Sequence, residues 1–206
     1  MSTDLKAVVQ TLCLAFDTDP VTEWNFPHDM ANRASLVEGY FRVTTEMILG
    51  HGGHVAATPG HEAVGVWSPA GAPEPTEAEL ADYASQLSRA CGDGAERALT
   101  IMPAIGAHRP ADLPPHFHAM FVGSRPEFRE QGAAAEILRM LAQALTEAGT
   151  GVGAEASSAH SLVLWQRFGL GPNGPEIRRP AHAPSLYPVW AGPGEWHIDD
   201  PPSKRA

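Results

Sequence analysis

The stretch from His116 to Ser157 constrains the fold of this chain most strongly. The run HFHAMFVG is rich in aromatic and β-branched residues and predicts a strand. It leads through the charged turn SRPEFREQ into a helical repeat with apolar residues on one side, which Gly149 ends. A second short strand follows in GVGAEAS, and SAHSLVLWQRFGL predicts another helix, ended by Gly169. This order predicts a βαβα core over residues 116–170.

The N-terminal elements follow from apolar spacing and from helix-breaking residues. Apolar residues at helical spacing begin at Leu5, with Asp4 available as a cap, and a longer helix is predicted over about residues 32–49, with Gly50 in the C-terminal capping position. Between them, DTDPVTEWNFPHDM contains two prolines. We expect this segment to interrupt the helix and to expose its aromatic side chains.

The remaining elements complete an α+β order with no internal repeat. HVAATP and AVGVWSP predict a hairpin, and Thr76 with Glu79 matches a capping box that starts a further helix. Residues 95–107 predict a helix that Pro103 kinks or ends early, and EIRRP and SLYPVWA predict two terminal strands. We expect a single domain over residues 1–192 and a flexible C-terminal tail over residues 193–206.

Composition limits the function classes. The 206 residues are 43% apolar, but no apolar run approaches the roughly 18 residues of a membrane span, and the N-terminus lacks the pattern of a signal peptide. Two cysteines, Cys13 and Cys91, predict no disulfide framework and fit a cytoplasmic protein. A net charge of −10 argues against a nucleic-acid partner and is compatible with a cationic or amine substrate. The sequence leaves a monomer and a homodimer open.

The first turn of the long helix is built from small residues, beginning at Gly132. Helix N-termini leave backbone N–H groups without partners and carry partial positive charge, so they bind phosphate groups readily. Small side chains let a phosphate approach these N–H groups, and Arg125 and Arg129 precede them. The alternative is a helix start that packs closely against a strand. The turn alone favours neither interpretation.

The residues around this turn resemble the GNAT family of N-acetyltransferases. The pattern is Arg129-x-x-Gly132-x-Ala134 after a strand, then a helix, then AEASSAHSLVLWQRFGL. The N-terminal half is similar to the branch near puromycin N-acetyltransferase, through AFDTDPVTEWNFP, VGVWSPAG and HRPADLPPHFHAMFVGSRP. The resemblance covers roughly residues 10–192. It implies a mixed, mostly antiparallel central sheet flanked by helices.

This resemblance implies an acetyl-CoA-dependent N-acetyltransferase in which a small-molecule amine attacks the thioester directly. No metal is implied, because the family needs none. The implied cofactor contacts are the end of the first core strand, the small-residue turn and two positions beyond the second strand: Val122, Gly123, Ser124, Arg129, Glu130, Gln131, Gly132, Ala133, Ala134, Ser158 and Trp165.

Three residues are candidates for the chemistry. The resemblance places Glu155 on the strand that lines the cleft, where it could remove a proton from the amine; a solvent-facing glutamate is the alternative. His116 and His118 alternate along their strand, so both side chains should face one side, and His118 could serve as base, as substrate contact or only as a strand-edge histidine. The backbone N–H of Val122 could polarise the thioester carbonyl.

Trp165 departs from the family pattern, in which a tyrosine often protonates the leaving thiolate. An indole N–H donates a hydrogen bond but does not give up its proton. Ser158 or Tyr187 could replace the acid, or the chain could be a non-catalytic acyl-CoA-binding or regulatory module on the same fold. For the substrate, one pocket wall is expected from four residues, with a hydrophobic loop packed on the sheet as the alternative: Trp24, Phe26, His28 and Tyr40.

Overall fold

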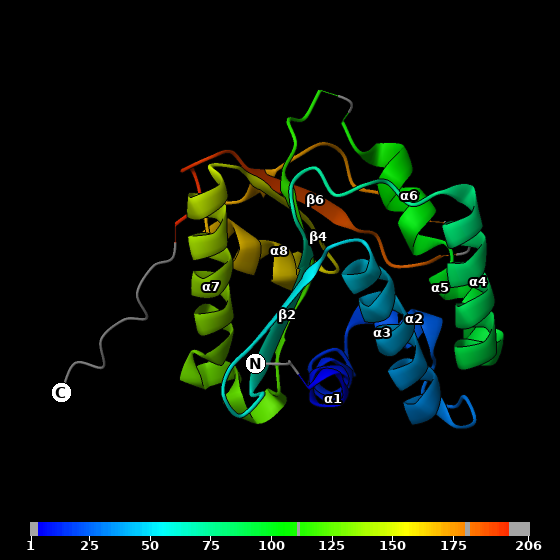
Figure 1. The fold of residues 1–206 in the computed structure, drawn as a ribbon. Helices are drawn as coiled ribbons and strands as arrows, with labels where there is room; N and C mark the ends of the chain where they lie inside the picture. The colour runs from blue at the N-terminus through cyan, green and yellow to red at the C-terminus, as the bar shows by residue number, and fades with distance from the viewer. Residues whose placement is uncertain (1–3, 111, 180–181, 198–206) are drawn as a thin grey trace.

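A six-stranded sheet forms the centre of the molecule (Figure 1). The computed structural model describes residues 4–110, 112–179 and 182–197. The strand order is β1-β2-β3-β4-β6-β5, and every neighbouring pair is antiparallel except β3 with β4. The strands are β1 (His54–Ala57), β2 (Ala63–Ser68), β3 (Phe117–Ser124), β4 (Val152–Ala156), β5 (Gly171–Pro172) and β6 (Tyr187–Ala191). The predicted α+β class with a mostly antiparallel sheet is confirmed.

Helices cover both faces of this sheet. In Figure 1, α7 lies on one side of β2, and α1 and α3 lie on the other, with α4 packed outside α3. The helices are α1 (Leu5–Ala15), α2 (Pro20–Asn25), α3 (Arg33–Gly50), α4 (Glu77–Cys91), α5 (Ala95–Ala98), α6 (Ile101–His108), α7 (Ala133–Ala148) and α8 (Ala159–Arg167), with short 3-10 turns at Gly92–Gly94 and Pro126–Gln131. No helix in the described ranges is both long enough and apolar enough to cross a bilayer.

The two faces bury separate apolar clusters. On the α1 and α3 face, the rings of Phe16, Tyr40, Phe41 and Phe121 pack with centroid distances of 5.1 to 6.3 Å. On the α7 face, the apolar stripe of the helix covers Phe117, Ala119, Val152 and Ala154 of the two parallel strands. Because side chains alternate along a strand, residues between these positions on β3 and β4 point to the opposite face.

The segment between α1 and α3 differs from the prediction. It forms the short helix α2 rather than an open break, because Asp19 caps it and Pro20 occupies its first position, where a missing N–H is not needed. Phe26 is fully buried instead of exposed. Arg33 also fixes the segment, since its guanidinium binds the carboxylate and the carbonyl oxygen of Asp17. Pro20 thus marks a helix start, whereas Pro27 follows the end of α2.

Three smaller predictions are also corrected. Gly50 is the last residue of α3, and His51 takes the capping position. The helix over residues 95–107 breaks at Leu99 and Thr100, so that Pro103 falls in the first turn of α6, where no helical N–H is required. EIRRP contributes only an isolated bridge between Ile177 and Leu186, while the strand lies at Gly171–Pro172.

The C-terminal segment that was expected to be flexible begins against the domain. The N–H of His197 donates to the carbonyl of Phe168, and the carboxylate of Glu195 accepts the N–H of Gly192 at 2.8 Å. Trp196 packs against the cluster on the α7 face. Residues 198–206 of the predicted tail lie outside the described residues.

Candidate active site

The parallel strands β3 and β4 stay together for only three residue pairs. Phe117, His118 and Ala119 pair with Val152, Gly153 and Ala154, whereas the other edge of β3 stays paired with β2 up to Ser124. In the described part of the chain, no strand pairs with the β4-facing edge of β3 beyond Ala119. Backbone N–H and C=O groups that are not hydrogen-bonded to a neighbouring strand need other partners. The predicted contacts Val122, Gly123 and Ser124 lie on this diverging part of β3, where an extended group could add as a strand.

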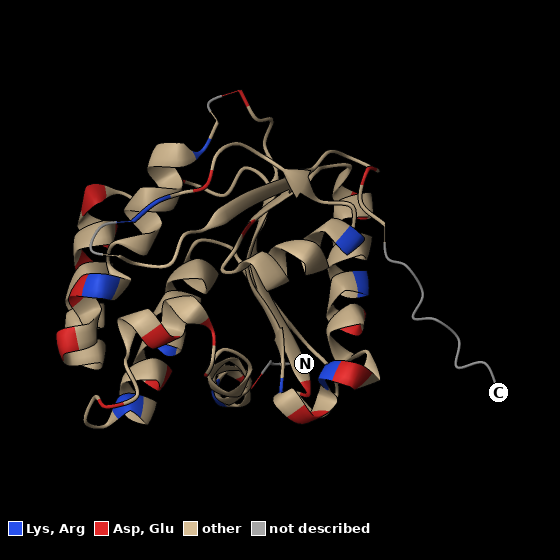
Figure 2. Ribbon diagram, turned by 180° about the vertical axis from the view of Figure 1, so that it is seen from behind, with Lys and Arg blue, Asp and Glu red and all other residues tan. Residues whose placement is uncertain are grey.

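Glu155 lies where the two strands begin to diverge. It is the one Asp, Glu, Lys or Arg in the six described strands, and the sheet is otherwise free of these residues (Figure 2). The Nε2 atom of His118 lies 2.7 Å from its Oε2 atom, so the imidazole N–H donates to the carboxylate. The side chains of His118 and Glu155 are 12% and 16% exposed. The sheet therefore holds one buried imidazole–carboxylate pair.

The surroundings of Glu155 favour its ionised form. Burial by itself raises the pKa of this carboxyl, but the charge and the hydrogen bond of His118 lower it, and Arg109 and His116 lower it further, so the net shift is downward. The carboxylate is thus ionised at neutral pH and able to accept a proton.

A small cavity of about 20 Å³ adjoins this pair. That volume holds about one water molecule. His116, His118 and Glu155 line it together with Ile105 of α6 and Ile177 of the β5–β6 connection. The two histidines therefore face the same side of the sheet, as their alternation predicts.

Gly153 makes room for the ring of His116. A Cβ atom at Gly153 would lie 3.3 Å from the Nε2 atom of His116, closer than most Cβ contacts. The His116 ring also meets the edge of Trp190 at a centroid distance of 4.8 Å. Burial lowers the pKa of His116, so this imidazole is neutral near pH 7. A glycine in β4 thus lets a neutral imidazole cover the strand beside Glu155.

The N-terminus of α7 is open. Gly132 has a left-handed backbone with φ of +79°, no side chain of the described residues caps the helix, and a Cβ atom at Gly132 would meet nothing within 4 Å. The N–H groups of Ala135 and Glu136 donate to the carbonyl of Gly132, so the amides before them point out of the helix start. The small residues do not serve close packing at Gly132. This geometry fits a phosphate group.

The basic and polar side chains of the turn have partners within the protein. Arg129 donates from Nη2 to the carbonyl of Ala15 at 2.9 Å, and Arg125 donates from Nε to the Thr11 hydroxyl at 3.1 Å. Gln131 donates to the carbonyl of Glu127, while Glu130 is exposed. Both arginines thus tie the turn to α1. Ala133 and Ala134 are half-buried.

The two predicted contacts beyond β4 have structural roles. The hydroxyl of Ser158 caps α8 by accepting the N–H of Ser161 at 3.1 Å, in a reciprocal capping box. Trp165 is half-buried and packs against the cluster on the α7 face. Tyr187, the alternative acid, is half-buried at the start of β6 and pairs with Ala156.

The four predicted substrate residues do not form one wall. Phe26 is fully buried and contacts Tyr40 at a ring-centroid distance of 5.9 Å, so both belong to the core of the α1 and α3 face. His28 is exposed and pairs with Glu23 at 3.1 Å. Only Trp24 is half-buried at the surface, with arginines over its ring. Alternating burial around the short helix α2 separates residues that are neighbours in the sequence.

Two further contacts have no counterpart in the sequence prediction. The hydroxyl of Ser157, two residues after Glu155, donates to the carboxylate of Asp19, which joins the start of α2 to the end of β4. Arg179 is buried beside Trp24. The Asp19-Pro20 dipeptide is a helix-start signal that could have placed Asp19 as a cap, but nothing local in EIRRP indicates that Arg179 is buried.

No three His, Cys, Asp or Glu side chains within the described ranges are placed so as to hold a metal ion. The arrangement of Glu155 with His118 can support proton transfer, and the open start of α7 can bind an anion.

Known acetyltransferases share this architecture. No protein-family model and no curated protein sequence matches the chain. A solved structure from Corynebacterium glutamicum, named as a histone acetyltransferase HPA2 and related acetyltransferase, is 18% identical with a TM-score of 0.64 and covers 94% of this chain and 93% of its own. The Drosophila melanogaster polyamine N-acetyltransferase, which forms N-acetylagmatine, is 18% identical with a TM-score of 0.54, covering 92% and 95%. An agmatine N-acetyltransferase is 16% identical with a TM-score of 0.53, covering 93% and 96%. The chain has the fold of the GNAT acetyltransferases, and identity at this level establishes the fold alone.

Proposed function

We propose that this chain is an acetyl-CoA-dependent N-acetyltransferase that acetylates a small-molecule amine. The observation that carries this proposal is the buried pair of His118 and Glu155 at the point where β3 and β4 diverge. An ionised carboxylate paired with an imidazole in an otherwise uncharged sheet has no evident structural use, since apolar residues would fill the same place at lower cost. Removal of a proton from the substrate amine would explain why a carboxylate is present at this position.

The reaction needs a neutral amine. An alkyl amine with a pKa near 10.4 is deprotonated only about once in 10³ molecules at pH 7. In the proposed mechanism, Glu155 accepts the proton, directly or through the water that the adjoining cavity can hold, and His118 fixes the carboxylate by its hydrogen bond. The amine nitrogen then forms a bond to the thioester carbonyl carbon, and the carbon–sulfur bond breaks with release of the thiolate.

The residues present fit the co-substrate. The open start of α7 at Gly132 suits the pyrophosphate group, and the unpaired edge of β3 suits the pantetheine arm, which carries amides. The N–H of Val122 is our candidate for polarising the thioester carbonyl. The remaining assigned contacts are the turn residues from Arg129 to Ala134 and, on α8, Ser158 and Trp165.

Acceptors to test first are cationic amines. Two proteins of similar fold are named for polyamine and agmatine substrates, and the net charge of this chain is −10. Because the N-terminal half of the chain resembles the branch near puromycin N-acetyltransferase, aminonucleosides should also be tested as acceptors. The free cysteines Cys13 and Cys91 suit a reducing compartment such as the cytoplasm.

A thiol-release assay with acetyl-CoA over an amine panel tests the proposal. Turnover with at least one amine, abolished in Glu155→Gln, is the expected result. Binding of acetyl-CoA without turnover of any amine rejects it and favours the non-catalytic acyl-CoA binder. Trp165→Tyr separates these two functions further, because activity that appears only in this variant identifies the wild type as a binder.

A further inference from the structure

The guanidinium of Arg179 is a buried charge with only neutral hydrogen-bond partners among the described residues. The residue is 6% exposed. Its Nε and Nη2 atoms donate to the carbonyl of Pro184 at 3.3 and 3.2 Å, and Nη1 donates to the hydroxyl of Thr100 at 3.4 Å. These distances are long for charge-assisted hydrogen bonds, which are usually 2.7–2.9 Å. A buried charge is normally paired with an opposite one.

A second arginine lies on the same aromatic ring. The guanidinium carbons of Arg179 and Arg97 lie 5.0 and 5.5 Å from the ring centroid of Trp24, and Arg97 also donates to the Trp24 carbonyl at 2.8 Å. Neither arginine forms an ion pair with a carboxylate in the described part of the chain. Two arginines at one indole, neither with a carboxylate partner, leave a local excess of positive charge that an anion would balance.

The nearest acidic group is already engaged. Asp19 attracts Arg179 electrostatically, but its carboxylate accepts the N–H groups of Val21 and Thr22 and the hydroxyl of Ser157. Asp19 and Arg179 are not among the ion pairs of the described residues. Asp19 therefore reduces the electrostatic repulsion between the two arginines but does not bind Arg179 directly.

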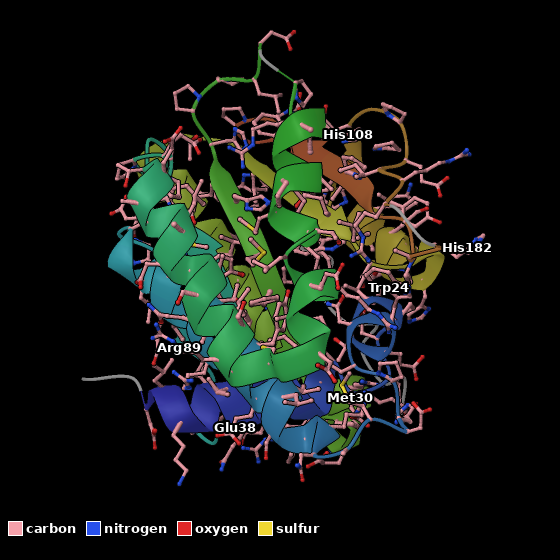
Figure 3. The ribbon with its side chains drawn as sticks, turned by 90° about the vertical axis from the view of Figure 1, so that its right-hand side faces the viewer. Trp24, Met30, Glu38, Arg89, His108 and His182 are labelled. Carbon is pink, nitrogen blue, oxygen red and sulfur yellow. The ribbon has the colours of Figure 1, made fainter. Side chains whose placement is uncertain are left out.

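This cluster lies beside the candidate active site. Ile177 lines the cavity next to Glu155, and Arg179 is two residues further along, which in extended chain is about 7 Å. Ser157, two residues after Glu155, contacts Asp19, which is attracted to Arg179. Figure 3 shows Trp24 on the side of the molecule where the β5–β6 connection passes through His182. These contacts connect the surroundings of Glu155 with those of Arg179.

We propose that the acceptor amine carries a carboxylate, which binds Arg179 over the face of Trp24 with Arg97 as the second cation. This inference rests on the proposed function and names the class of its acceptor: an amino acid whose amine lies several bonds from its carboxylate. A guanidinium binds carboxylate or phosphate in two-pronged fashion. The carboxylate is favoured because Asp19 lies close enough to Arg179 to interact with it electrostatically and would repel the second negative charge of a phosphate more strongly than a single charge.

Matched pairs of amines test this inference. Lysine differs from cadaverine, and ornithine from putrescine, by one carboxylate, and in both amino acids the side-chain amine lies several bonds from it. In the wild type we expect kcat/KM to be about 10 to 100 times higher for the carboxylate-bearing member, the range of one or two charge-assisted hydrogen bonds. Arg179→Met should reduce this ratio to about one, and Arg179→Lys to an intermediate value. Arg178→Met, at the exposed neighbouring position, should leave the ratio unchanged.

Ligand-induced thermal shifts separate this inference from the proposed function and show that each variant is folded. Lysine should raise the Tm of the wild type and of Arg178→Met but not of Arg179→Met, whether or not any amine is acetylated. Acetylation that favours cadaverine in both the wild type and Arg179→Met overturns the inference and leaves the acetyltransferase in place. Absence of any Arg179-dependent shift also overturns it, and a larger shift with phosphoethanolamine than with lysine assigns the site to phosphate instead.

Discussion

The two edges of β3 differ in how long they stay paired, and this difference divides the molecule into two regions. On the closed edge, β3 pairs with β2 from His118 to Ser124, and the flanking helices bury apolar side chains against both strands. On the open edge, β3 leaves β4 after three pairs, and the polar residues Glu155, Asp19 and Arg179 follow in the contacts beyond this point, with Arg179 buried and the two carboxylates partly buried. The closed edge stabilises the fold, and the open edge holds the residues that we propose for catalysis.

The largest expected effect is a loss of stability on the closed edge. Phe41 is 1% exposed and contacts the rings of Phe16, Tyr40 and Phe121. Phe41→Ala should lower the free energy of unfolding by about 3–5 kcal/mol, because it removes a buried ring and leaves a cavity. Urea denaturation measures this loss, and the exposed Leu80→Ala should stay within about 0.5 kcal/mol of the wild type. A similar loss of unfolding free energy in both variants would contradict the conclusion that the closed edge stabilises the fold through its buried rings.

The next effect concerns activity on the open edge. Glu155→Gln keeps the shape of the side chain but cannot accept a proton, so kcat/KM should fall at least about 10²-fold, or about 2.7 kcal/mol of activation free energy. Steady-state assays measure this loss, and circular dichroism checks the fold. Glu147→Gln, on the exposed side of α7, is the matched control and should retain full activity. Wild-type rates in Glu155→Gln would remove this residue from the mechanism.

Local signals in the sequence were sufficient for elements whose causes are local. The capping box of Thr76 and Glu79 starts α4 as predicted, and the βαβα order gives β3, α7, β4 and α8. The alternation of His116 and His118 placed both on one side of the strand. In each case the determining residues lie within one or two turns of each other, or on one strand.

Contacts between distant segments could not be predicted in this way. The bond between His118 and Glu155 joins positions 37 residues apart and depends on the register of β3 with β4. The burial of Arg179 depends on Trp24 and Thr100, which belong to other elements. The strand-like run EIRRP gives no indication that Arg179 is buried, because the burial of a side chain depends on the segments that pack against it.

A smaller effect compares the two ends of α7. Gly132 and Gly149 both have left-handed backbones, with φ of +79° and +62°, and a Cβ atom at either would meet nothing within 4 Å. Alanine at each position should therefore lower stability by about 1 kcal/mol. Only Gly132→Ala should raise the KM for acetyl-CoA, by about tenfold, since its methyl group occupies the approach to the open amides. Equal KM values in the two variants would exclude the phosphate site.

The carboxyl of Glu155 gives the open edge a stability that depends on pH. Its pKa in the folded protein is lowered, chiefly by His118 against the opposing effect of burial. The stability that it contributes is therefore present above the unfolded pKa of about 4.3 and is lost as pH falls through the folded pKa. Relative to Glu155→Gln, the wild type should lose stability as the pH is lowered below this value, as urea midpoints measured at several pH values can show. If the stability of the wild type and of Glu155→Gln changed with pH in the same way, the pKa of Glu155 would not be lowered by folding.

The smallest effect has the opposite sign and comes from Asp19. Burial raises the pKa of this carboxyl, Glu23 adds to the rise, and the hydrogen bonds from Ser157, Val21 and Thr22 oppose it. Its contribution to stability is full below the unfolded pKa of about 3.9 and is lost as pH rises through the folded pKa. Asp19→Asn caps α2 equally well and does not titrate, so it should differ from the wild type by less than about 1 kcal/mol at any pH.

The difference in unfolding free energy between Asp19→Asn and the wild type should therefore move in favour of the variant as the pH rises from 4 to 7. Glu155→Gln provides the contrast, because its pH-dependent difference lies at lower pH and favours the wild type as the pH rises. The two carboxylates lie on opposite sides of Ser157 along one path of contacts, yet one has an imidazole partner and the other has mainly burial. If both variants showed the same sign, burial rather than the partner would determine the charge of Glu155, and the ionised base at the open edge would be lost.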